Sequence, residues 1–166
     1  MTLEQLGSDS RFMNAVQTTI ASFPNKPFLC LPMSCCLLGY LERFCPEYNL
    51  AVKTGDLFFK DHLILKQNFD MNRLADEDID IAWEGHAWLE VNDQFIVDLS
   101  IPRTILSDAF TSPYKDDVVA YLGTKCLIID KDNNRNLLRH VERSVLSAPL
   151  VDAIINNALK TYFSQS

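Results

Sequence analysis

The chain has 166 residues, of which 48% are hydrophobic, so one domain can bury a core without disulfide or metal cross-links. Its formal net charge is -7, and no cluster of lysine and arginine interrupts the acidic balance, which argues against a nucleic-acid partner. The opening residues do not resemble a secretory signal, and the longest apolar region, Phe28 to Leu41, is too short and too interrupted to span a bilayer. The sequence therefore predicts a single domain over residues 1–166, cytoplasmic and without a membrane partner.

Five cysteines, an odd number without a CxxC pair, favour reduced thiols over a disulfide framework. Four of them, Cys30, Cys35, Cys36 and Cys45, are not spaced like the ligands of a zinc ion, so no metal is predicted. The simplest interpretation of Cys35, Cys36, Cys45 and Cys126 is that they are small buried hydrophobic residues.

Two helices are predicted in the first third of the chain. Ser8, Asp9 or Ser10 can cap the first, in which apolar residues recur at near-helical spacing until Pro24. The second has a stronger apolar stripe and is predicted between Pro32, which suits a first turn, and Pro46, which lies beyond its end.

From Asn49 the apolar period changes to two, which predicts strands over Asn49–Thr54, Leu57–Phe59 and His62–Lys66. Turns are predicted between them at Gly55-Asp56 and Lys60-Asp61. A long acidic surface loop is expected over Asp70 to Glu84, followed by a hairpin of strands Gly85–Val91 and Gln94–Leu99. After Pro102 come a short helix, a strand over Lys125–Ile129, a polar helix over Asn136–Arg143 and an amphipathic helix from Val151. Helices, antiparallel strands and helices in this order predict an α+β fold, with N-terminal helices packed on an antiparallel sheet and an additional C-terminal helix.

Histidine is the side chain best suited to act as a base near neutral pH, and the chain has three. His62, in a strand, and His140, in the predicted polar helix, are both expected to be solvated. His86 opens a strand after a glycine, and Asp98 ends the partner strand, where an unpaired carboxylate would be costly. Orienting His86 and stabilising its protonated form would explain Asp98.

The hairpin register tests this pairing. A two-residue turn, with Val91 opposite Gln94, would place Asp98 on the wrong face, opposite Ala87. A three-residue turn that pairs Glu90 with Gln94 would set His86 opposite Asp98. The other face would then be apolar throughout: Ala87, Leu89, Phe95, Val97 and Leu99. The sequence predicts an odd-length loop or an equivalent bulge.

Cys30 is the candidate nucleophile, because a thiolate at a helix N-terminus gains from the helix dipole and from free N–H groups. Cys35 and Cys36 lie inside the second helix and Cys45 at its C-terminal end. Without His86 and Asp98, a buried loop cysteine would be the preferred interpretation of Cys30.

These residues resemble the transglutaminase-like branch of papain-like cysteine enzymes. The matching segments are Cys30-Leu31-Pro32-Met33-Ser34, the helix that follows, Gly85-His86-Ala87-Trp88-Leu89-Glu90-Val91 and Val97-Asp98-Leu99-Ser100. The Cys30-Leu31 start and the compact size are most similar to small bacterial leader peptidases that process lasso-peptide precursors. The resemblance implies a papain/transglutaminase-like core with Cys30 as nucleophile, His86 as general base and acid, and Asp98 orienting His86. The chain departs from the family at Cys45-Pro46-Glu47, and the family's oxyanion side-chain donor has no evident counterpart.

The expected reaction is acyl transfer through a Cys30 acyl-enzyme, needing no cofactor, with hydrolysis of a bond in a peptide or protein substrate favoured by the resemblance. Transfer to an amine, as in a transglutaminase, and a thioester-dependent acetyltransferase remain alternatives. So does a non-enzymatic binding module on the same fold. The acidic residues Asp76, Glu77, Asp78 and Asp80 would favour a cationic substrate, although most charge runs are only solvated faces.

Overall fold

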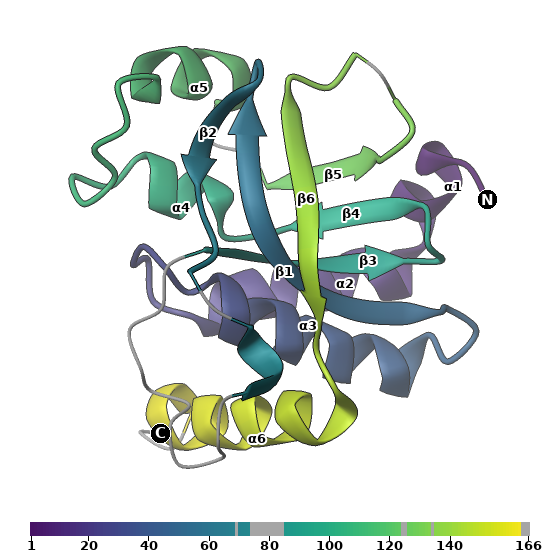
Figure 1. Cartoon of the computed structure of the whole chain (residues 1–166). Helices are drawn as coiled ribbons and strands as arrows, with labels where there is room; N and C mark the ends of the chain where they lie inside the picture. The colour runs from purple at the N-terminus through teal and green to yellow at the C-terminus, as the bar shows by residue number, and fades with distance from the viewer. Residues whose placement is uncertain (69, 74–84, 124–125, 134, 164–166) are drawn as a thin grey trace.

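The structure is a computed structural model, which describes residues 1–68, 70–73, 85–123, 126–133 and 135–163. Over these ranges it is mixed helix and antiparallel sheet, as the α+β prediction required (Figure 1). The helices are α1 (Leu3–Ser8), α2 (Ser10–Ser22), α3 (Cys30–Phe44), α4 (Ile101–Ile105), α5 (Lys115–Leu122) and α6 (Ala148–Ala158), with shorter helical turns at Met71–Arg73 and Leu159–Phe163. The strands are β1 (Leu50–Phe59), β2 (His62–Leu65), β3 (His86–Val91), β4 (Phe95–Asp98), β5 (Leu127–Asp130) and β6 (Leu138–Val145). No helix among the described residues is long and apolar enough to cross a membrane.

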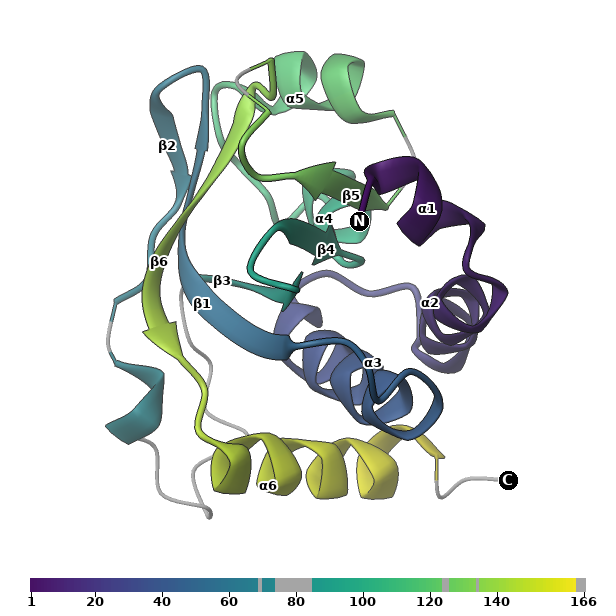
Figure 2. The ribbon, with the colours of Figure 1, turned by 90° about the vertical axis from the view of Figure 1, so that its right-hand side faces the viewer.

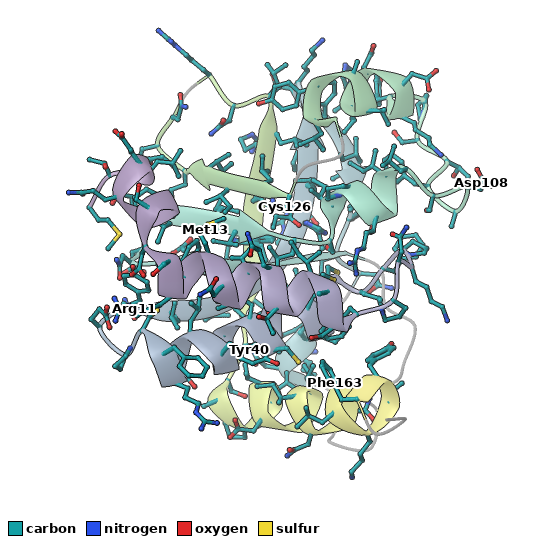
Figure 3. The ribbon with its side chains drawn as sticks, turned by 180° about the vertical axis from the view of Figure 1, so that it is seen from behind. Arg11, Met13, Tyr40, Asp108, Cys126 and Phe163 are labelled. Carbon is teal, nitrogen blue, oxygen red and sulfur yellow. The ribbon has the colours of Figure 1, made fainter. Side chains whose placement is uncertain are left out.

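Helices α2 and α3 confirm the two predicted near the N-terminus. The Asp9 carboxylate caps α2 by accepting from the backbone N–H of Arg11 at 2.9 Å, and α2 ends at Ser22, just before Pro24. Helix α3 begins at Cys30 and packs against β3, while α2 and α6 pack against α3 (Figures 2 and 3). The main hydrophobic core therefore lies around α3.

Strand β1 is continuous, so the predicted turn at Gly55-Asp56 is wrong. Its first half pairs with β3 and its second half with β6, and the pairing with β6 is irregular between Thr54 and Gly55. Figure 1 shows β1 bending from the direction of β3 to that of β6. A Cβ atom on Gly55 would lie 1.9 Å from the carbonyl oxygen of Val141, so glycine is needed here for the close approach of β6.

The β3–β4 hairpin confirms the predicted odd-length loop. Asn92 and Asp93 have positive φ angles of 55° and 54°, and the three-residue loop pairs Val91 with Phe95. This register differs by two residues from the expected one. Continued along the strands, it places Asp98 opposite Trp88, diagonal to His86 and on the same face. The predicted apolar face is confirmed, since its five residues are all buried in the core around α3: Ala87, Leu89, Phe95, Val97 and Leu99.

The predicted helix over Asn136–Arg143 is wrong, because this segment lies mostly in strand β6, antiparallel to β1. Branched Val141 and Val145 suit an extended chain, and the open edge of β1 supplies hydrogen-bond partners that residue spacing does not reveal. This correction places His140 in strand β6 instead of a surface helix. Its side chain is only 1% exposed, so the expectation that it is solvated is wrong. His62 is exposed on β2, as predicted.

We predict that Gly55→Ala will lower the free energy of unfolding by at least about 1–3 kcal/mol, because the added methyl group forces β6 away from β1. The matched control is Gly7→Ala, since a Cβ at Gly7 meets nothing within 4 Å. Urea unfolding measures the free energy of unfolding of both variants. Equal stability of Gly55→Ala and the wild type would contradict the close approach of β6.

Candidate functional site

The His86 and Asp98 side chains meet inside the curled sheet. His86 is the first residue of β3 and Asp98 is the last of β4, and they are 1% and 0% exposed. Nε2 of His86 is in direct hydrogen-bonding contact with Oδ2 of Asp98. The diagonal register thus brings the two predicted residues together, although not as a directly opposed pair.

The Asp98 carboxylate receives two further hydrogen bonds. The backbone N–H of Ile101, at the start of α4, donates to Oδ1 at 3.2 Å. Nε2 of His140, on β6, donates to Oδ2 at 2.9 Å. Three donors from three separate segments therefore fix this buried carboxylate, which satisfies the requirement that a buried charge be paired.

Cys30 is the first residue of α3, where backbone N–H groups have no partner within the helix and the helix dipole favours negative charge. It is close enough to His86 to raise the pKa of that ring. Because Nε2 of His86 contacts Asp98, Nδ1 of the ring remains available to a second partner.

The remaining cysteines lie in surroundings that disfavour a thiolate. Burial raises the pKa of Cys36 to about 11, and it also raises the pKa of Cys35, which lies wholly inside the core. Burial likewise raises the pKa of Cys45 and Cys126. Reactivity toward an electrophile is therefore disfavoured at these four thiols.

Helix α4 connects the segment that carries Asp98 with the loop that precedes Cys30. The Arg103 guanidinium donates to the carbonyl oxygens of Ile20 at 2.6 Å and Pro24 at 3.0 Å, at the end of α2. The Thr104 hydroxyl accepts from the backbone N–H of Phe28 at 3.2 Å, where Phe28 has a positive φ of 61°. These contacts fix the loop two residues before Cys30 relative to the strand that ends at Asp98.

Two histidines share Asp98, and their pKa values move in opposite directions. Burial opposes charge on His86. The negative charge of Asp98, the hydrogen bond that His86 donates to it and the nearby Cys30 together raise the pKa of His86. Burial dominates at His140 and lowers its pKa. Burial alone would raise the pKa of Asp98, but the charge of His86 and the hydrogen bonds of both histidines hold it well below its usual range.

His86, Asp98 and His140 are also the group among the described residues whose ligand atoms, all within 4.8 Å of one another, could hold a metal ion. Nε2 of each histidine is already bonded to the same carboxylate oxygen, so an ion could enter only by breaking both hydrogen bonds. The arrangement suits a hydrogen-bond network better than a metal centre.

Sequence reasoning missed His140, because a polar segment with two arginines resembles a solvated helix. The branched residues Val141 and Val145 were the available signal for a strand, and they are a weak one. The acidic residues Asp76, Glu77, Asp78 and Asp80, which were expected to favour a cationic substrate, lie outside the described residues.

No family model, curated protein or solved structure matches this chain at a significant level. The resemblance to transglutaminase-like enzymes therefore stays a prediction from the residues quoted for it.

We predict that Asp98→Asn will cost about 3–5 kcal/mol of stability, because it leaves His86 buried without its counter-charge. The loss should be greatest between pH 3.8 and 6.5, the ordinary pKa values of the two groups. Folding lowers the pKa of Asp98, so the charged carboxylate adds its full share to the free energy of unfolding above pH 3.8, and this share is lost as the pH falls through the lowered pKa. Folding raises the pKa of His86, so the charged imidazole adds its full share below pH 6.5, and this share is lost as the pH rises through the raised pKa.

Urea unfolding across this pH range measures the difference, and Asp108→Asn, at an exposed aspartate, is the control. A loss in Asp98→Asn that is the same at every pH would show that His86 and Asp98 do not form a charged pair.

Proposed function

We propose that Cys30, His86 and Asp98 form the catalytic triad of a thiol enzyme that transfers acyl groups, and that it hydrolyses a peptide or amide bond. The observation that carries the proposal is the buried contact between the His86 ring and the Asp98 carboxylate, and Cys30, at the start of α3, is close enough to raise the pKa of the same ring. A thiol at the start of a helix, with the imidazole and carboxylate in line behind it, is the arrangement that activates a nucleophile.

In the first step, the Cys30 sulfur attacks the carbonyl carbon of the substrate and a carbon–sulfur bond forms. The carbon–nitrogen bond then breaks, and His86 gives its proton to the leaving amine. In the second step, water attacks the thioester, His86 takes a proton from it, and the carboxylic acid leaves as the sulfur is released. Asp98 stabilises the His86 ring whenever it is charged. The first-turn N–H groups of α3, including that of Cys30, are candidate donors to the oxyanion.

The papain/transglutaminase-like core belongs to the same proposal. Three features support it: Cys30 begins a helix that packs on the sheet, His86 begins β3, and Asp98 ends the adjacent strand. A peptide or protein substrate, and a place among small leader-peptidase-like enzymes, follow only from the resemblance of these segments.

Acylation by p-nitrophenyl acetate tests the triad without knowledge of the substrate. We predict that the acetyl group is transferred to Cys30, with release of p-nitrophenolate, and that mass spectrometry will locate the thioester there. Cys30→Ala should abolish the modification and His86→Ala should slow it by roughly 100-fold, the typical minimum contribution of a positioned base. Cys126→Ser, at a half-buried cysteine, is the matched control and should behave as the wild type.

The rival functions give different results in the same assay. A binding module would show slow acylation spread over the cysteines and unaffected by His86→Ala, which would contradict the proposal. Faster acylation by acetyl-coenzyme A than by the ester would identify an acetyltransferase instead. Capture of the acetyl group by an added amine in preference to water would identify an amine transferase.

A further inference from the structure

His140 reaches the site from a strand that is not adjacent to the strand bearing Asp98. Strand β6 pairs with β1, while β4 is separated from β1 by β3. The sheet curls so that His140 nevertheless lies 2.9 Å from the Asp98 carboxylate. Strand β6 approaches β1 so closely at Gly55 that no side chain fits between β1 and the carbonyl of Val141.

Ring contacts fix the orientation of the His140 side chain. The Trp88 ring meets it edge-on, with centroids 4.9 Å apart, and the His86 ring lies 5.7 Å away at a tilt of 38°. Trp88 is itself only 2% exposed. The His140 ring therefore has little freedom to turn its Nε2 away from Asp98.

The surroundings of the second nitrogen decide the protonation state of His140. Nδ1 is buried and has no hydrogen-bond partner among the described residues. A proton on Nδ1 would be buried without an acceptor, whereas a proton on Nε2 donates to a carboxylate. His140 is therefore neutral, with its proton on Nε2. His86 differs, because Asp98 and the nearby Cys30 outweigh its burial and raise its pKa.

We propose that His140 is a positioning residue of the triad: a neutral imidazole that donates to Asp98 and holds its carboxylate toward His86. This inference rests on the proposed function. When His86 gives its proton to a leaving amine, Asp98 loses its counter-charge while still buried. The hydrogen bonds from His140 and Ile101 then remain to stabilise it.

Two variants separate the hydrogen bond from the packing. His140→Gln keeps an N–H close to the position of Nε2, whereas His140→Phe keeps a ring against Trp88 and removes the donor. The first readout is the rate of Cys30 carbamidomethylation by iodoacetamide as a function of pH. His140→Gln should stay close to the wild type. His140→Phe should be slower by roughly tenfold, the effect of losing one hydrogen bond to a charged group. The acid limb of its profile should move to higher pH, because Asp98 becomes easier to protonate.

The second readout is nitrogen NMR of the histidine rings, which does not depend on catalysis. In the wild type, His140 should be neutral with its proton on Nε2 while His86 is charged. A charged His140, a proton on its Nδ1, or equal pH profiles of the Gln and Phe variants would overturn the proposal for His140. Slow carbamidomethylation of Cys30 at every pH in the wild type, with the NMR result as expected, would overturn the enzyme function alone.

Discussion

The site depends on one buried carboxylate that serves two imidazoles. Asp98 accepts from His86 and from His140 through the same oxygen, yet the pKa values of the two rings move in opposite directions. Burial opposes charge on both rings, but Asp98 and the nearby Cys30 raise the pKa of His86, whereas Nδ1 of His140 has no hydrogen-bond partner among the described residues. One anion in a low-dielectric interior cannot stabilise two cations, so the environment assigns the charge to His86.

The fold can be understood as the support for this carboxylate. Strand β4 ends at Asp98, and the backbone of α4 donates to it. Through Arg103, α4 also binds the end of α2, and through Thr104 it binds the loop before Cys30. Strand β6 pairs with β1 across Gly55 and carries His140, which donates to the same carboxylate. Elements far apart in the sequence therefore hold the Asp98 carboxylate and its partners in fixed positions. The proposed acyl transfer would require such precise positioning of its reacting groups.

Much of this could be predicted from the sequence where local chemistry decides the structure. A cap at Ser8, Asp9 or Ser10, a second helix with Pro32 in its first turn and the odd loop of the hairpin follow from residue type and spacing. Two errors, at Gly55 and around His140, share a cause. A glycine before an aspartate has the composition of a turn, and a polar arginine-rich segment has the composition of a surface helix. Both segments are instead strand because β1 and β6 pair with each other, a contact between residues some 85 positions apart that no local pattern encodes.

The proposed triad requires a Cys30 thiolate paired with a charged His86 and supported by Asp98, and the ultraviolet absorbance of the thiolate tests this requirement directly. The difference spectrum between the wild type and Cys30→Ser, recorded near neutral pH, should contain the thiolate band, and the band should disappear when the same comparison is made in a His86→Gln background. Identical spectra for the wild type and Cys30→Ser would contradict the account.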